Sequence, residues 1–248
     1  MPHARSLIAK AVAIGRQESL TELVSKTRRF LRRKAFWKLQ NHRLTRGLYY
    51  RLFDSTRYWE QRYASGGSSG PGSRGEHAAF KADFVNGFVD EHDVSTVVEF
   101  GCGDGDQVSL GEYPAYVGLD VSESVIERCS ERFADDPSKR FRVYDPFEFD
   151  DHDALRADLV LSLEVLFHLV DDAVFEKTMY NMFATAERYV IIFSSNYDDP
   201  APEIHVRHRR FTDYVEETFP AFELVDRTEN PFEDRASDFY VYERTDPA

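Results

Sequence analysis

Residues 97–107, VVEFGCGDGDQ, decide the fold. A short β-branched run passes directly into Gly101, Gly103 and Gly105, and Asp120 stands at the end of the next expected strand. Glycines let the backbone amides of a turn approach a ligand closely, and a carboxylate at the end of the neighbouring strand accepts the hydroxyls of a ribose. The segment therefore predicts a binding site for a cofactor that contains a nucleoside.

Strands and helices alternate on both sides of this segment. We expect strands at 95–100, 115–120, 140–145, 157–163 and 188–195, and helices at 76–91, 122–134 and 171–186. This alternation predicts an α/β fold, with a doubly wound, mostly parallel sheet that is covered on both faces. Residues 221–229 and 238–244, joined by a turn at Asn230 and Pro231, predict an antiparallel C-terminal hairpin.

Composition excludes several classes of protein. The 248 residues are 42% hydrophobic, which suffices for a buried core, yet they contain no uninterrupted apolar run long enough for a spanning helix. The two cysteines, Cys102 and Cys129, form neither a disulfide framework nor a zinc motif, so we expect no metal site. The first residues make a poor secretory signal, and a cytoplasmic location is expected.

Charge divides the chain into a basic head and an acidic body. Residues 1–51 carry a net charge of +11, whereas the whole chain carries −13. We expect a helical N-terminal extension over residues 1–57 and one catalytic domain over 58–248. The basic amphipathic helix expected within 20–38 contacts an anionic membrane surface or an acidic partner, or else packs on its own acidic body. An acidic body repels phosphate backbones, so nucleic acid is not expected as a partner.

Local charge selects between two nucleoside cofactors. Glu99, Asp104 and Asp106 surround the glycines, where they would oppose the pyrophosphate of a dinucleotide and attract the cationic methionine end of S-adenosylmethionine. The spacing GxGxG also differs from the dinucleotide fingerprint GxGxxG. S-adenosylmethionine is therefore the expected cofactor. A nicotinamide-dependent oxidoreductase and an inactive cofactor-binding scaffold are the alternatives.

Several motifs resemble those of class I S-adenosylmethionine-dependent methyltransferases. They are VEFGCGDG (98–105), GLDVS (118–122) and ADLVLSLEVLFHL (157–169), and the resemblance covers residues 58–244. YWEQRYASGGSSGPGSRGEHAAFKADFVNGFV (58–89) and HVRHRRFTDYV (205–215) are similar to a prokaryotic subgroup associated with glycan biosynthesis. The resemblance implies a Rossmann-like sheet of seven strands, one of them antiparallel.

The resemblance also implies roles for individual residues. Glu99, Gly101, Cys102 and Gly103 would contact the methionine portion of the cofactor, and Asp120 would hold the ribose. The adenine would be contacted by Val121, Asp145, Pro146 and Phe147, although DPF is equally typical of a simple turn.

The acceptor side is expected beyond the fourth strand. His168 is the preferred general base because imidazole titrates near neutrality, with Glu164 as the second candidate; a structural role for His168 is the alternative. The candidates for binding an anionic acceptor are His205, Arg207, His208 and Arg209, unless these side chains pair with neighbouring acids instead. We expect methyl transfer to a hydroxyl or carboxyl oxygen of a small anionic molecule, such as a sugar or a glycan intermediate. The glycine-rich residues 66–76 are expected to form a lid over the cofactor, near Tyr58, Trp59 and Arg74.

Overall fold

The computed structural model describes residues 27–28, 38, 42, 45–199, 203–232 and 236–246. Contacts divide the chain into two units, residues 1–49 with 202–204, and residues 50–201 with 205–248. Apart from isolated positions, the basic helix expected within 20–38 lies outside the described residues, so its contacts stay predictions. No described helix has the length and apolar character needed to cross a membrane.

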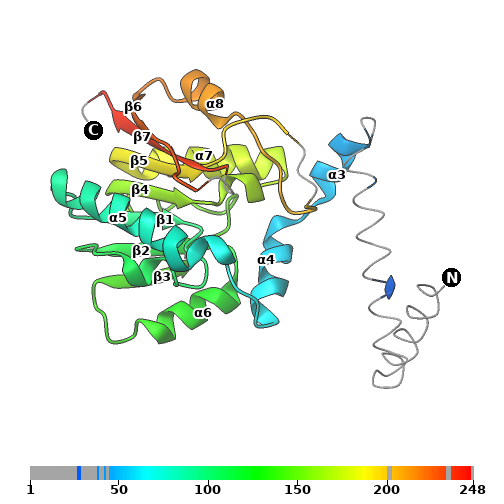
Figure 1. Cartoon of the computed structure of the whole chain (residues 1–248), viewed down its shortest axis with the longest axis horizontal. Helices are drawn as coiled ribbons and strands as arrows, with labels where there is room; N and C mark the ends of the chain where they lie inside the picture. The colour runs from blue at the N-terminus through cyan, green and yellow to red at the C-terminus, as the bar shows by residue number, and fades with distance from the viewer. Residues whose placement is uncertain are drawn as a thin grey trace. The chain divides into compact units, whose positions relative to one another are not determined.

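The larger unit is built on one sheet of seven strands (Figure 1). The strands are β1 (Val97–Phe100), β2 (Tyr116–Asp120), β3 (Lys139–Val143), β4 (Ala157–Leu163), β5 (Ala186–Ser194), β6 (Phe222–Thr228) and β7 (Asp238–Arg244). Their order is β3-β2-β1-β4-β5-β7-β6. The first five strands are parallel, whereas β7 runs antiparallel to both β5 and β6. The predicted Rossmann-like sheet with an antiparallel C-terminal hairpin is confirmed.

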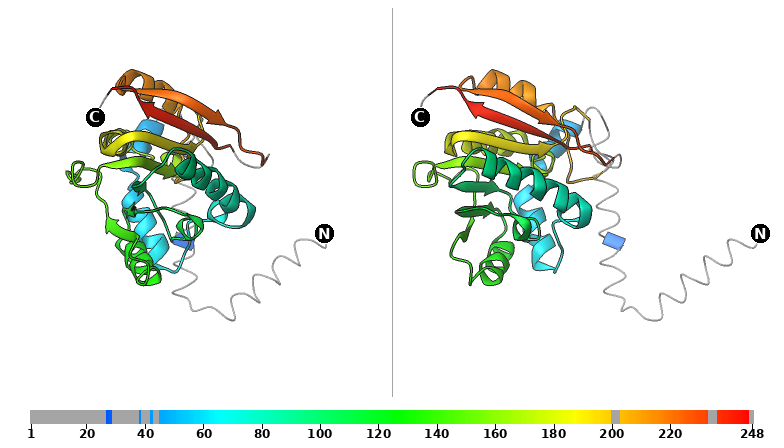
Figure 2. Two further views of the ribbon diagram at one scale, coloured as in Figure 1. Left: turned by 90° about the vertical axis from the view of Figure 1, so that its left-hand side faces the viewer. Right: turned by 60° about the vertical axis from the view of Figure 1, so that its left-hand side comes forward.

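Helices cover both faces of the sheet (Figures 1 and 2). On one face, α7 (Asp172–Thr185) and α8 (Phe211–Thr218) pack against alternate strand residues such as Val160, Val190 and Ile192. On the other face, α5 (Gly75–Glu91) and α6 (Glu123–Arg132) pack against Leu159 and Leu161 with their neighbours. The central strands are buried on both faces, as parallel strands under crossover helices must be.

The helix ends follow from local sequence. Ser122 caps α6 by accepting a hydrogen bond from the amide of Val125, as expected for a serine at this position. Asp54 caps α4 (Ser55–Ala64) by accepting from the amide of Arg57 at 2.8 Å. The sequence analysis did not anticipate α4 or α8, whereas the short helix α3 (Arg46–Leu52) falls within the predicted helical extension.

The strand order reverses between β1 and β4. From β1 the chain crosses to β2 and β3 on one side of the sheet, and it then returns to β4 and β5 on the other side. Ligands of open α/β sheets bind at such a reversal, beyond the carboxyl ends of the strands. The residues that follow β1, β2 and β4 are therefore the ones to inspect.

Candidate functional site

A turn of three glycines follows β1. Gly101, Gly103 and Gly105 all have positive φ, of 86°, 58° and 77°, a region that residues with a Cβ avoid. We call residues 101–105 the glycine turn. Its start is held by Leu119, whose carbonyl accepts hydrogen bonds from the amides of Gly101 (2.7 Å) and Cys102 (3.0 Å). The turn is thereby fixed to the end of β2.

Asp120 lies directly beside the glycine turn. One carboxylate oxygen accepts from the amide of Gly103 and the other from the amide of Ser122, both at 3.0 Å. The side chain is buried, and burial raises the pKa of Asp120 to about 6 although these backbone hydrogen bonds oppose the rise. The carboxylate predicted to bind the ribose is thus held in a fixed orientation at the carboxyl end of β2.

Glu99 lies on β1 just before the turn and is buried. The Tyr116 hydroxyl donates a hydrogen bond of 2.6 Å to its carboxylate. Burial raises the pKa of Glu99 to about 7, while this hydrogen bond and the charge of Lys81 act in the opposite direction. A cationic group placed beside Glu99 would stabilise the ionised form.

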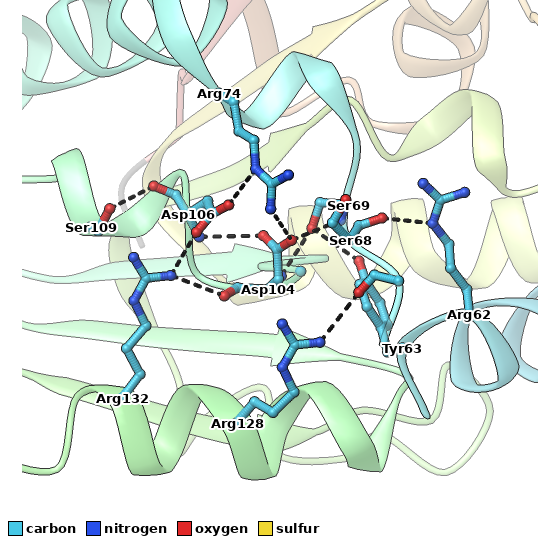
Figure 3. Close-up of polar contacts among 12 residues, drawn as sticks. Arg62, Tyr63, Ser68, Ser69, Arg74, Asp104, Asp106, Ser109, Arg128 and Arg132 are labelled. Carbon is cyan, nitrogen blue, oxygen red and sulfur yellow. Dashed lines mark hydrogen bonds and ion pairs between the residues drawn. The ribbon is translucent and has the colours of Figure 1, made fainter. Parts of the chain in front are cut away.

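The other two acids near the turn, Asp104 and Asp106, are paired with arginines. Asp106 pairs with Arg74 at 2.7 Å and with Arg132 at 2.8 Å, and Asp104 lies 3.8 Å from Arg74 (Figure 3). Their charges are therefore balanced by arginines of this chain. Of the three carboxylates expected to attract a cationic cofactor, two are thus paired with arginines, and Glu99, with Asp120 close by, is the one left for that role.

A different feature disfavours a dinucleotide. The turn leads into a single 3₁₀ turn, η2 (Val108–Leu110), and not into an α-helix. A pyrophosphate in a dinucleotide site is stabilised by the amino end of the helix that follows the glycines. Because no such helix follows the glycine turn, the site lacks the phosphate-binding device that the alternative cofactor requires.

Residues 66–74 cross the glycine turn, and we call them the glycine strap (Figure 3). The Ser69 amide donates to the Asp104 carboxylate at 2.9 Å, and the Ser69 hydroxyl accepts from the Asp104 amide at the same distance. Tyr63 Oη lies 3.1 Å from Ser69 Oγ. The approach is so close that a Cβ on Gly103 would lie 2.3 Å from Ser69 Oγ. The expected lid therefore rests on the glycine turn; its response to the cofactor stays a prediction.

The expected adenine wall is less ordered. Asp145 accepts a hydrogen bond of 2.9 Å from the amide of Phe147, which is the turn that the DPF sequence also allows. Phe147 is 58% exposed, Val121 is half-buried, and the carbonyl of Pro146 accepts from Asn181 at 2.9 Å. Their roles toward adenine stay predictions. Cys102 is buried beside Gly118, in keeping with a small packing residue.

Glu164 follows β4 in an unusual conformation. Its φ is +61°, which is rare for a residue with a side chain. The carboxylate pairs with the Lys81 ammonium at 2.9 Å, and a Cβ on Gly72 of the strap would lie 2.0 Å from the same carboxylate. Lys81 is 1% exposed. Strain at a strand end and a buried ion pair are both typical of functional sites.

His168 lies in η3 (Leu166–His168), against the ring of Trp59 at 4.8 Å. Its Nδ1 lies 3.0 Å from the carbonyl of His205. A carbonyl only accepts, so Nδ1 carries the proton and Nε2 retains the lone pair. Burial lowers the pKa of His168 to about 3. The near-neutral titration expected of this imidazole is thus corrected, since His168 is neutral throughout the physiological range.

Two of the three arginines of the HVRHRRF segment, Arg207 and Arg209, have internal partners, whereas Arg210 is exposed. Arg209 donates to the carbonyls of Leu169 (2.6 Å) and Val170 (2.8 Å), and Arg207 donates to Val170 at 3.0 Å. Both also pair with Asp172 at the start of α7. The structure therefore favours the alternative given in the sequence analysis, in which these arginines pair with neighbouring groups. Their side chains tie the HVRHRRF segment to residues 169–172, which connect β4 to α7.

The two histidines of that segment differ. His205 stacks on Tyr58 at 4.7 Å and on His168 at 5.2 Å, which places it at the candidate acceptor side. His208 instead has its Nδ1 2.6 Å from the Ser195 hydroxyl and stacks on Tyr197. Only His205 is brought together with His168.

Three residues of the site were not singled out from the sequence: Arg62, Ser69 and Lys81. Lys81 alone carried a signal. It falls among Ala78, Ala82, Val85 and Val89 on the buried face of α5, where an unpaired lysine is not expected. The partner of Ser69, Asp104, is 35 residues away, and Arg62 contacts Ser68 and Trp59 without any sequence pattern that marks it.

Residues 98–186 match the family described as Methyltransferase domain. No curated protein matches the sequence. The fold is similar to that of the N-methyltransferase NodS from Bradyrhizobium japonicum in complex with S-adenosyl-L-homocysteine, with a TM-score of 0.62 and 16% identity over 78% of this chain and all of that one. The fold is also similar to that of magnesium protoporphyrin IX methyltransferase from Synechocystis with bound S-adenosylmethionine. The TM-score is 0.60 and the sequence identity 13%, over 78% of this chain and 98% of that one. A methyltransferase from Anabaena variabilis is similar with a TM-score of 0.58 and 16% sequence identity, over 77% of this chain and 96% of that one.

Proposed function

We propose that this chain, an S-adenosylmethionine-dependent methyltransferase by its matched domain and its fold, transfers a methyl group to an oxygen of a small anionic acceptor. The domain match together with the fold confirms the predicted class of enzyme and the predicted cofactor. The acceptor class is our inference: a sugar, a sugar acid or a glycan intermediate. Peripheral attachment to a membrane through residues 20–38 belongs to the same proposal.

The residues around the glycine turn fit the cofactor. When bound, S-adenosylmethionine supplies an electrophilic methyl group on a sulfonium. Glu99 offers a carboxylate for the ammonium of its methionine end, and Asp120 offers one for the ribose hydroxyls. A 3₁₀ turn follows the glycines in place of the α-helix whose amino end would stabilise a phosphate, and S-adenosylmethionine carries no phosphate. These residues bind and orient the donor, which is the main contribution of an enzyme to this displacement.

The observation that carries the acceptor proposal is the pair of groups following β4. The Glu164 carboxylate is held by Lys81 next to the strap, and neutral His168 presents Nε2 as a hydrogen-bond acceptor. A hydroxyl must lose its proton during transfer, and Glu164 is the group suited to receive it. A carboxylate acceptor has no proton to lose. His168, with a pKa of about 3, is a weak base, and the Glu164 carboxylate is already paired with Lys81, so these two groups favour a carboxyl oxygen over a hydroxyl.

The test is methyl transfer to three matched sugars. The protein is incubated with isotopically labelled S-adenosylmethionine and with glucuronate, glucose or glucosamine, which offer a carboxylate, hydroxyls alone, or an amine. We expect labelled glucuronate whose methyl group is removed by mild alkali, as an ester is. Asp120→Asn provides the control that lacks the ribose ligand. Labelling of glucosamine alone would contradict the proposal, because it would show transfer to nitrogen.

A further inference from the structure

One face of α4 is directed at His168. Ser55, Trp59 and Arg62 are spaced four and three residues apart, so they share a face of the helix. The Ser55 hydroxyl donates to the carbonyl of His168 at 2.9 Å, and the Trp59 ring lies 4.8 Å from the imidazole. The charge of Arg62 contributes to the lowered pKa of His168. The three side chains therefore line the candidate acceptor side.

Arg62 differs from three other arginines near the site. Arg74, Arg207 and Arg209 each pair with a carboxylate. Among the residues that the structure describes, no carboxylate oxygen lies within 4.0 Å of a nitrogen of Arg62. Its Nε donates to the carbonyl of Ser68 at 2.6 Å, and the guanidinium carbon lies 5.3 Å from the centre of the Trp59 ring. The strap and the tryptophan thus fix the guanidinium.

This fixed guanidinium has an open edge. Nε is bound to the strap and Nη2 lies near Gly70, but neither Nη1 nor Nη2 makes a hydrogen bond to a residue that the structure describes (Figure 3). Two parallel N–H groups match the two oxygens of a carboxylate, and a guanidinium that is already oriented loses less entropy on binding. The residue also stays partly exposed, so a ligand has access to it.

We propose that Arg62, backed by Trp59 and adjacent to His168, binds the anionic group of the acceptor. This inference rests on the proposed function and assigns to Arg62 the role that the sequence analysis gave to Arg207 and Arg209. Lys81 is paired with Glu164 and His168 is neutral, so Arg62 brings the one uncompensated positive charge of these groups. A single cation matches a monoanion such as a carboxylate better than the dianion of a phosphate monoester.

The rings around Arg62 suit an acceptor that is itself a ring. Tyr58 stacks on His205 at 4.7 Å, and Trp59 packs edge-on against Tyr58 at 5.5 Å. All three side chains are half-buried, so each keeps part of its surface exposed. Apolar surface beside a few fixed polar groups is the usual composition of a small-molecule site. A cyclic sugar acid combines the required anion with a face that lies on such rings.

The test is calorimetric titration of the full-length protein, saturated with S-adenosylhomocysteine, with glucuronate, glucose and glucose 6-phosphate. We expect glucuronate to bind more tightly than the other two. Arg62→Gln, which keeps a donor for Ser68 but removes the charge, should weaken glucuronate binding about tenfold or more, as loss of a charge-assisted hydrogen bond does. Arg62→Lys should retain an intermediate affinity. Arg57→Gln, an exposed position on the same helix, is the matched control and should bind as the wild type does.

The affinity of each variant for S-adenosylhomocysteine separates the outcomes. Equal glucuronate binding by wild type and Arg62→Gln would overturn the proposal, and so would the absence of any glucuronate binding by the wild type. An equal loss of S-adenosylhomocysteine affinity would also overturn it, because Arg62 would then serve the donor. Arg62-dependent binding of glucuronate without its methylation would instead retain this inference and count against the proposed function.

Discussion

Replacement of Gly103 by alanine tests how the glycine strap is held on the glycine turn. A Cβ at this position would lie 2.3 Å from Ser69 Oγ and 3.2 Å from Tyr63 Oη, so the strap must move away. The move breaks the two hydrogen bonds between Ser69 and Asp104. A neutral and a charge-assisted hydrogen bond together contribute about 2–4 kcal/mol, part of which is recovered when water replaces the strap. We therefore expect a loss of about 1–3 kcal/mol from this contact.

Gly75→Ala is the matched control for the backbone. Gly75 has the same φ of 58° as Gly103, but a Cβ there would meet no described atom within 4 Å. Each alanine therefore costs about 1–2 kcal/mol for its left-handed backbone, and Gly103→Ala alone carries the additional loss of the strap contact. The difference in unfolding free energy between the two variants isolates that contact.

Two measurements without cofactor decide the question. Urea unfolding gives the free energies, and hydrogen exchange of the strap amides reports local detachment. We expect faster exchange at Ser69 in Gly103→Ala and protection close to that of the wild type in Gly75→Ala. Equal destabilisation of both variants with unchanged exchange at Ser69 would refute the reasoning, because the strap would then not rest on Gly103.

Three further predictions concern titration and packing. Burial raises the folded-state pKa of Glu99 from 4.5 to about 7, so ionisation of this carboxyl lowers the stability of the folded state increasingly as the pH rises between these values. In urea unfolding, the wild type should lose up to about 3 kcal/mol relative to Glu99→Gln over this pH range. A stability difference that does not change with pH would contradict this prediction. Arg209→Ala should lower the free energy of unfolding in urea by about 2–4 kcal/mol because it leaves the carbonyls of Leu169 and Val170 without donors. The control, Arg210→Ala at an exposed position, should lower it by less than about 0.5 kcal/mol. A stable Arg209→Ala protein with a raised Michaelis constant for the acceptor would instead restore the acceptor-binding role of Arg209. Nitrogen NMR of His168 at about pH 5 should show a neutral ring with the proton on Nδ1, and an imidazolium signal would disprove its low pKa.

Most of the sheet could be predicted from the sequence because its signals are local. Hydrophobic runs ending in glycine or aspartate mark β1 and β2, and Ser122 marks the start of α6. α4 carries a cap residue, Asp54, but no apolar periodicity to accompany it. Its aromatic residues point to different partners, Tyr63 toward the glycine turn and Trp59 toward His168, so no single apolar stripe appears.

The candidate site could be predicted only where its chemistry depends on neighbours in the sequence. The glycine turn and Asp120 are of this kind. The charge state of His168 depends on burial, and the partners of Arg207 and Arg209 lie nearly forty residues away at the start of α7. Asp104 and Asp106 likewise meet Arg74 only because the strap folds back over the turn. Long-range pairing of this sort leaves no periodic trace.

The fit of the strap limits how this stretch can be altered. By composition, residues 66–74 invite the insertion of an epitope tag or a labelling loop, since glycine and serine usually mark tolerant surface segments. Here Gly72 is buried against Glu164, with no volume left for even one methyl group. An insertion at this point would separate the segment from both Asp104 and Glu164. Exposed turns remote from these carboxylates are the better places for a reporter.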